Sequence, residues 1–226
     1  MASHSVASHS VASHSVQQEI NISMIRRTLV IGIAGGSAAG KSTFTDALAR
    51  ILPINSSCTV EVFHTDTYFH HDKLRGPTFW SVSAGEEQFD CNHPDSVDNT
   101  QLCADVQARA AATDAPQVIL IEGLMVLHEP TIREWLDLRL FIELDADERA
   151  LRRLLRNMTK GQEPTSIATY YRECARVGHA RFVEPSRSHA DFIIRGDADF
   201  TRLSRLVAEI IKGRLLQISS DSTEAK

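Results

Sequence analysis

Apolar residues recur along the chain in two rhythms. Short runs with few polar interruptions predict buried β-strands, and segments in which apolar residues return every three or four positions predict helices. The run Gln117–Ile121 is apolar almost throughout, which is typical of a strand covered on both faces of a sheet. The runs with strand character are Thr28–Ile33, Thr59–Phe63, Gln117–Ile121, Arg139–Leu144 and Asp191–Ile194.

Helical spacing fills the stretches between these runs. One helix follows the first strand, where Phe44, Leu48, Ile51 and Leu52 share a face. The others are predicted near Asn99–Ala112, Asp147–Met158, Ser166–Phe182 and Phe200–Leu216. Alternation of strands and helices predicts an α/β fold, with a central parallel sheet of about five strands flanked by helices. Such sheets bind ligands at the carboxyl ends of their strands.

The two ends of the chain have a different composition. The pentapeptide ASHSV occurs three times in tandem over residues 2–16 and has neither the basic nor the apolar region of a secretory signal. We therefore predict a low-complexity disordered tail over 1–24, one folded domain over 25–218 and a second disordered tail over 219–226. Whether the repeats belong to the natural chain stays open.

Composition limits the partners and the cellular compartment that we expect for this domain. The 226 residues are 42% hydrophobic, enough for one domain with a sizeable core, and the net charge of −5 without a basic stripe argues against nucleic acid as a partner. No apolar run reaches the roughly 18 residues of a membrane span. Four scattered cysteines without a CxxC pair suggest reduced thiols. We expect a cytoplasmic protein, and a homo-oligomer is left open.

The stretch GIAGGSAAGKST, residues 32–43, joins the first strand to its helix and fits the pattern GxxxxGK[ST]. Its glycines let backbone N–H groups converge on phosphate oxygens at the positive end of a helix, the lysine neutralises the outer phosphates, and the serine hydroxyl suits Mg²⁺. The fold predicted is therefore a P-loop NTPase. The residues expected to bind the nucleotide are Gly35, Gly36, Ser37, Ala38, Ala39, Gly40, Lys41, Ser42 and Thr43.

Two acidic residues at strand ends favour a small-molecule kinase. Asp66 lies just past the second strand, where a carboxylate can orient and deprotonate a substrate hydroxyl. Glu122 ends the third strand, where an acid beside a P-loop usually serves Mg²⁺. A turn or cap for Asp66 and a structural acid for Glu122 are the alternatives. The guanine motif NKxD of GTPases and the LSGGQ signature of transporter ATPases are both absent.

A basic stripe marks the predicted helix 147–158. Arg149, Arg152, Arg153 and Arg156 fall on one face, and the leucines between them fall on the other. The polar segment TKGQEP that follows is typical of a mobile lid, which we predict near Met158–Pro164. Guanidinium groups on a lid would clamp a transferring phosphate, whereas a solvated basic face is the alternative.

With these stretches together, the chain resembles the uridine kinase family, within the group that contains phosphoribulokinases and nicotinamide riboside kinases. The stretches that carry the resemblance are HTDTYF, HPDSVDN, VILIEGLMVL, LFIELDADERALRRLLRN and FVEPSRSHADFII, besides the P-loop. The resemblance implies transfer of the γ-phosphate of ATP to a primary hydroxyl, typically the 5′-hydroxyl of a nucleoside.

The same resemblance implies roles for individual residues. Asp66 becomes the general base, Ser42 and Glu122 hold Mg²⁺, and Lys41 serves catalysis. Arg153 and Arg156 match the arginines that contact substrate and phosphate, and Phe69 stands where the family places a tyrosine against the base. For the ribose hydroxyls, Asp90 is preferred over Asn92.

Two departures from the family pattern affect specificity more than chemistry. The segment ARAAATDAPQ, between the helix after HPD and the strand ending in Glu122, has no room for the hairpin that reads the pyrimidine edge. Lys160 and Gln162 stand where the lid usually has arginines. Nicotinamide riboside and phosphorylated sugars therefore remain candidate acceptors beside uridine and cytidine, and a non-catalytic nucleotide-binding regulator remains the rival reading.

Overall fold

The computed structural model describes residues 28–54, 56–70 and 75–224. The ASHSV repeats and the rest of the predicted N-terminal tail lie outside the described residues. So do the first three residues of the predicted domain.

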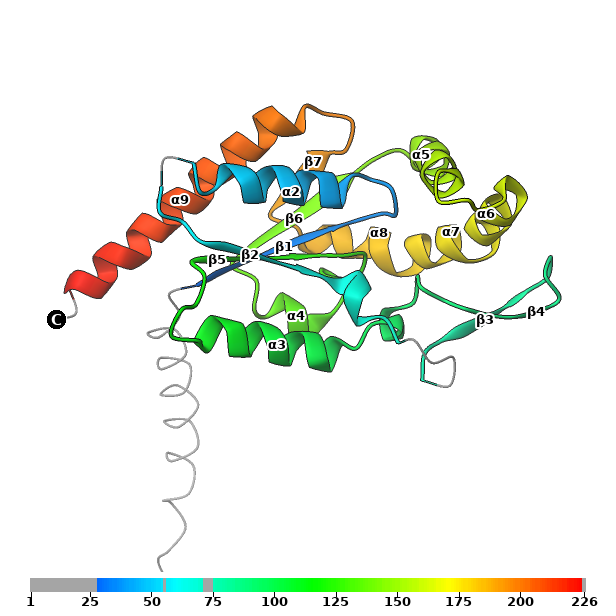
Figure 1. The fold of residues 1–226 in the computed structure, drawn as a ribbon, viewed down its shortest axis with the longest axis horizontal. Helices are drawn as coiled ribbons and strands as arrows, with labels where there is room; N and C mark the ends of the chain where they lie inside the picture. Colours follow the sequence, from blue (N-terminus) through cyan, green and yellow to red (C-terminus); the bar gives the residue numbers. More distant parts are fainter. Residues whose placement is uncertain (1–27, 55, 71–74, 225–226) are drawn as a thin grey trace, which may run out of the picture.

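A five-stranded parallel sheet forms the centre of the fold, in the order β2-β5-β1-β6-β7 (Figure 1). Each predicted strand exists, with its first residue shifted by one position and its last residue by one or two. Gly35, the first P-loop residue, is therefore the last residue of β1, and Glu122 is the last residue of β5. The strands are β1 (Leu29–Gly35), β2 (Val60–His64), β5 (Val118–Glu122), β6 (Leu138–Glu143) and β7 (Phe192–Arg195).

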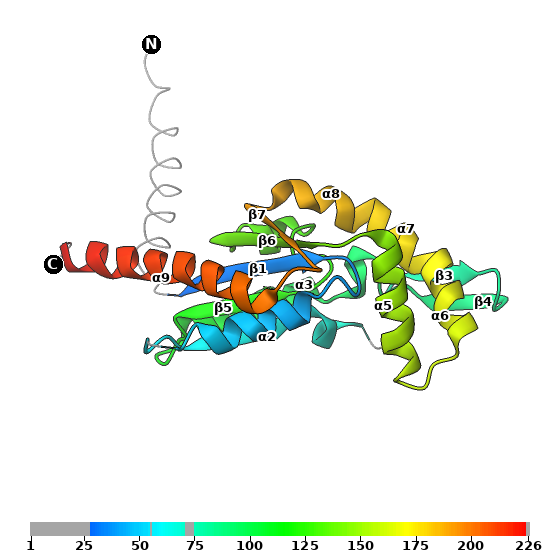
Figure 2. The same cartoon turned by 90° about the horizontal axis from the view of Figure 1, so that it is seen from above.

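Helices cover both faces of this sheet. On one face lie α2 (Lys41–Ile51) and α9 (Phe200–Glu224), and on the other α3 (Asn99–Ala111) and α4 (Pro130–Arg133) (Figures 1 and 2). Strand β1 explains the two layers, because Ile31 and Ile33 pack into the core under α2 and α9 while Val30 packs into the core under α3 and α4. Each fully buried side chain of this size contributes about 1.5–3 kcal/mol.

The helices after β6 differ most from their prediction. Helix α5 (Ala146–Met158) and α6 (Pro164–Tyr170) are followed by two π-helical stretches, Tyr171–Ala175 and His179–Val183. Between and after these stretches come α7 (Arg176–Gly178) and α8 (Glu184–Ser186), so the helical path continues past Phe182, where we predicted its end. Helix α9 likewise reaches Glu224, beyond the predicted Leu216 and into the segment predicted as a tail.

One element was missed by the sequence analysis. Strands β3 (Thr78–Ser81) and β4 (Glu86–Phe89) form an antiparallel hairpin of their own, apart from the main sheet. Its second strand begins Glu86-Glu87-Gln88 and its turn contains Ser83, Ala84 and Gly85. This polar sequence has none of the apolar alternation that predicts a strand. The segment between α3 and β5 has no hairpin among its described residues, as the sequence predicted.

Among the described residues, no helix is both long enough and apolar enough to cross a membrane.

A close approach of backbone and side chain connects the end of β5 to the segment after β2. Gly123 follows Glu122, and its amide donates to the carbonyl of Ile33 at 3.1 Å. A Cβ atom at this position would clash with the side chain of buried Thr65, the residue before Asp66. Only glycine therefore lets these two segments meet.

We expect Gly123→Ala to lower the free energy of unfolding by about 1–3 kcal/mol, the usual cost of overpacking. Urea denaturation measures the change. The control is Gly213→Ala in α9, where an added methyl group meets no atom within 4 Å. That change should leave stability equal or raise it by about 0.5–1 kcal/mol, since alanine favours helix. Equal stability of the Gly123→Ala protein and the wild type would contradict the steric argument.

Candidate active site

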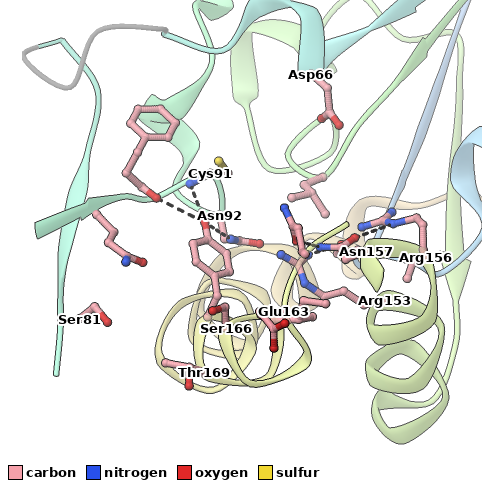
Figure 3. Close-up of a pocket in the computed structure, with 18 of the residues that line it drawn as sticks. Asp66, Ser81, Cys91, Asn92, Arg153, Arg156, Asn157, Glu163, Ser166 and Thr169 are labelled. Carbon is pink, nitrogen blue, oxygen red and sulfur yellow. Dashed lines mark hydrogen bonds between the residues drawn. The ribbon is translucent and has the colours of Figure 1, made fainter. Parts of the chain in front are cut away.

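A cavity of about 830 Å³ opens at the carboxyl ends of the strands. The P-loop, the turn after β2, the end of β5, helix α5, helix α6 and the β3–β4 hairpin all contribute to its wall (Figure 3). Of the residues predicted from sequence, the cavity is lined by Ser37, Ala38, Lys41, Ser42, Asp66, Phe69, Glu122, Arg153 and Arg156.

The P-loop has the backbone of an anion-binding loop. Helix α2 begins at Lys41, so its free N–H groups point toward the loop. Ala38 has φ 63°, and it is the one non-glycine residue with positive φ among the described residues. Such strain is usual at functional loops. The Lys41 ammonium donates to the Gly36 carbonyl at 3.1 Å. Burial lowers the pKa of Lys41, while the carboxylates of Glu122 and Asp66 oppose this effect.

Glu122 is the centre of a small polar cluster. Its Oε1 atom accepts a hydrogen bond from the Ser42 hydroxyl at 3.0 Å and lies 2.9 Å from His64 Nδ1. The side chain is buried. Oxygen ligands from a serine and a carboxylate suit Mg²⁺. The residues present therefore fit the ion that the sequence predicted at Ser42 and Glu122.

His64 flanks Asp66 in the sequence, which predicts a surface or substrate-contact histidine in preference to a metal ligand. It ends β2, and the register pairs it directly with Glu122 of β5. The signal that could have found it is its place as the last residue of a strand, one position short of the turn that carries Asp66.

Asp66 lies in a 3-10 turn, Thr65–Tyr68, that follows β2, and its carboxylate faces the cavity (Figure 3). Burial raises the pKa of Asp66, the Glu122 carboxylate adds to this effect, and the Lys41 ammonium opposes it. A carboxylate with a raised pKa is a better proton acceptor than an ordinary aspartate, because the catalytic pKa lies closer to neutral pH.

The four arginines of α5 divide into two pairs. Arg153 donates to the Ser37 hydroxyl at 2.7 Å and, like Arg156, lines the cavity. Arg149 is buried, donates to the Leu144 carbonyl at 2.9 Å and packs against Gly36. Arg152 pairs with Glu148 at 2.7 Å and donates to the Gly196 carbonyl at 2.9 Å. Arg149, Arg152 and Arg153 thus contact the P-loop or its neighbours rather than forming a solvated face. Arg156 is exposed and lies at the cavity.

The other face of α5 points away from the protein. Leu151, Leu155 and Met158 are 57%, 64% and 43% exposed, whereas apolar stripes of helices usually face a core. The turn after α5 lies where we predicted a lid, and its Gln162 and Glu163 line the cavity.

Asp90, our preferred ligand for the ribose hydroxyls, is not among the residues that line the cavity. Its Oδ1 accepts from the backbone N–H of Asn92 at 2.8 Å and from the Cys174 thiol at 3.0 Å. Asn92, the weaker candidate from sequence, does line the cavity. Asn92 is otherwise buried, and its amide donates to the Tyr170 hydroxyl and the Cys174 thiol, each at 3.3 Å.

Tyr170 is the residue of this wall that the sequence did not single out. Its hydroxyl donates to the Phe89 carbonyl at 3.3 Å and accepts from the amide of Asn92 at 3.3 Å. The Arg153 guanidinium lies over its ring, 5.4 Å from the centroid. Nothing in the segment TYYREC marks this tyrosine, since the partners of its hydroxyl lie about 80 positions earlier.

Comparison with known proteins agrees with this geometry. The sequence model of the phosphoribulokinase / uridine kinase family matches residues 97–199. A uridine kinase from Chloroflexus aggregans is 30% identical over 190 residues, which cover 74% of this chain and 87% of that protein. A uridine kinase from Chlamydia pneumoniae is 28% identical over 86% of this chain and 94% of its own.

Among solved structures, one described as a possible uridine kinase from Bacillus stearothermophilus superposes with a TM-score of 0.51 at 15% identity. The match covers 80% of this chain and 99% of that one, which supports the fold. With a P-loop, an acid at the end of β5 and an arginine helix arranged around one cavity, and with relatives of this identity and coverage, the chain belongs to the phosphoribulokinase / uridine kinase family.

Proposed function

We propose that the protein is an ATP-dependent kinase that phosphorylates the 5′-hydroxyl of a neutral riboside, with uridine and cytidine as the first candidates. One observation carries the proposal: Lys41, Asp66 and Glu122 meet in a cavity whose remaining wall is rich in uncharged hydroxyl and amide groups. The names of the curated relatives support the nucleoside class.

ATP would bind with its phosphates on residues 35–43. Backbone N–H groups of the loop and the N-terminus of α2 would hold the phosphate oxygens, and Lys41 would neutralise the outer phosphates. Ser42 and Glu122 would hold Mg²⁺, which on binding offsets the charge that develops on the transferred phosphoryl group. Arg153 and Arg156 would act on the same group from α5, since both line the cavity.

Asp66 would accept the proton of the acceptor hydroxyl while the hydroxyl oxygen forms its bond to the γ-phosphorus. The bond from that phosphorus to the β,γ-bridging oxygen breaks, and ADP leaves. The neighbouring Lys41 ammonium would keep Asp66 ionised until the transfer, because opposite charges favour each other's charged form. Closure of the predicted lid, Met158–Pro164, would exclude water as a competing acceptor.

The chemistry of the acceptor wall favours an uncharged substrate. Away from the phosphate end, the residues that line the cavity offer hydroxyl and amide groups and a tyrosine ring, from Ser81, Ser83, Gln88, Asn92, Thr165, Ser166, Thr169 and Tyr170. A sugar phosphate would bring a second anion, whereas the cations that line the cavity, Lys41, Arg153 and Arg156, are the ones proposed to act on the phosphates of ATP. An anion left without a partner is costly to enclose. Phe69 would cover a flat base by stacking, which is tolerant of base identity.

Replacement of the base tests the mechanism. Asp66→Asn should lower kcat at least about a hundredfold, the scale of lost general-base catalysis, with little change in ATP affinity. Steady-state kinetics with uridine, combined with binding of a non-hydrolysable ATP analogue, separates the two effects. Near-normal turnover in this variant would remove Asp66 from the mechanism.

The pH profile provides an independent check. Asp66 must be ionised to accept a proton, and its pKa is raised above the ordinary 3.8 of an aspartate. The value of kcat/KM should therefore fall on acidification at a pH above 3.8. Tryptophan fluorescence over the same range shows whether the fold persists. An activity that stays constant to pH 3.8 in folded protein would contradict the raised pKa.

A panel of acceptors tests the substrate class. We expect uridine to exceed a riboside with another base by less than about a hundredfold in kcat/KM, since no group reading the pyrimidine edge was identified. Nicotinamide riboside and a phosphorylated sugar complete the panel, and the sugar phosphate should be the poorest. Strict uridine preference would show that the wall reads the base. No acceptor-dependent release of ADP from any member would favour the non-catalytic regulator.

A further inference from the structure

The β3–β4 hairpin contributes a wall of the cavity but has little support of its own. It pairs with no strand of the main sheet, and an isolated two-stranded hairpin is only marginally stable in water. Ser81, Ser83, Ala84, Gln88 and Phe89 nevertheless line the cavity. Their positions therefore depend on contacts between the hairpin and the rest of the protein.

One carboxylate supplies three of these contacts. Glu173 lies in the π-helical stretch Tyr171–Ala175, and its Oε2 accepts from the Ser81 hydroxyl at 2.7 Å. Its Oε1 accepts from the hydroxyl of Ser83 at 2.7 Å and from the backbone N–H of Ser83 at 3.2 Å. Ser81 is 1% exposed, and its own oxygen accepts from the Ala84 N–H at 3.2 Å. The carboxylate thus holds the turn through three hydrogen bonds.

Tyr170, three residues before Glu173 on the same helical path, contacts the end of the hairpin away from its turn. The rings of Phe79 and Tyr170 meet edge to face with centroids 5.6 Å apart, and the Tyr170 hydroxyl donates to the Phe89 carbonyl at 3.3 Å. Figures 1 and 2 show β3 and β4 lying alongside α6 and α7 in both views. Tyr170 itself lines the cavity, whereas Glu173 lies behind the hairpin and does not.

We propose that Glu173 is a positioning residue that holds the β3–β4 hairpin over the acceptor end of the cavity and thereby sets the affinity for the acceptor. The proposal rests on the kinase function proposed above. Two residues of one helical segment thus have different roles: Tyr170 lines the cavity, and Glu173 holds the hairpin that faces the cavity. ATP binding should be independent of Glu173, because among the described residues the P-loop and α5 make no hydrogen bond to the hairpin.

The charge of Glu173 matters to this role. Hydrogen bonds from Ser81 and Ser83 lower the pKa of Glu173, so it is a carboxylate at neutral pH. Bonds to an ionised acceptor are about twice as strong as neutral ones. A glutamine would keep one acceptor oxygen, but its NH₂ group cannot accept from the Ser83 N–H.

The experiment compares Glu173→Ala and Glu173→Gln with a matched control, Glu86→Gln. Glu86 is an exposed acid on β4 whose side chain has no hydrogen bond or ion pair with another described residue. Uridine and cytidine serve as acceptor probes. Glu173→Ala should raise the acceptor KM about tenfold, the effect expected for lost hydrogen bonds to a charged group, and Glu173→Gln should raise it less. The KM for ATP should stay within about twofold, and Glu86→Gln should match the wild type in both.

Hydrogen exchange measured by mass spectrometry supplies a readout that needs no turnover. In Glu173→Ala, amides of residues 78–89 should exchange faster, while those of α2 and α9 keep the wild-type rate. An unchanged exchange rate of the hairpin, or an equal rise in KM for ATP and acceptor, would overturn the proposal. If the wild type phosphorylates neither probe, the proposed substrate is wrong, and the exchange rates alone decide whether Glu173 holds the hairpin.

Discussion

Pairing of β5 between β1 and β2 is the constraint on which the candidate site depends. The register sets Glu122 beside Ile33 on one side and beside His64 on the other. Because parallel strands end at one edge, this pairing brings the P-loop after β1, the acid at the end of β5 and the turn after β2 to one place. Gly123 completes the arrangement, since its missing side chain leaves room for Thr65, and Asp66 follows directly.

The electrostatics of the phosphate end follow from that convergence. Lys41, Asp66 and Glu122 each influence the pKa of another member, so the cluster holds a cation and two acids partly out of water. Such an arrangement is costly unless the charges are compensated. Arg149 and Arg156 of α5 add positive charge near this cluster, and the phosphates of a nucleotide would balance it.

Helix α5 shows how tertiary structure can reverse the usual meaning of an amphipathic pattern. Its leucine face is exposed while Arg149 is buried against the Leu144 carbonyl and Gly36. The sequence alone defines two faces but not which one turns inward. The stripe faces the protein because the strand end at β6 and the P-loop present carbonyl and hydroxyl acceptors there, which no leucine could satisfy.

The sequence by itself determined the parallel sheet, the P-loop and the acids at the strand ends, because these follow from local periodicity and fixed spacing within one strand–loop–helix unit. It did not determine the β3–β4 hairpin, the bond from the Cys174 thiol to Asp90 or the contacts of Tyr170 and Glu173. Each of these rests on partners about 80 to 90 positions away, such as Ser83 for Glu173 and Asn92 for Tyr170. Polar side chains in a short hairpin carry no periodic signal of their own. Their positions are defined only in the folded protein, where the helical path after α6 packs beside the hairpin and supplies hydrogen-bond acceptors for its donors.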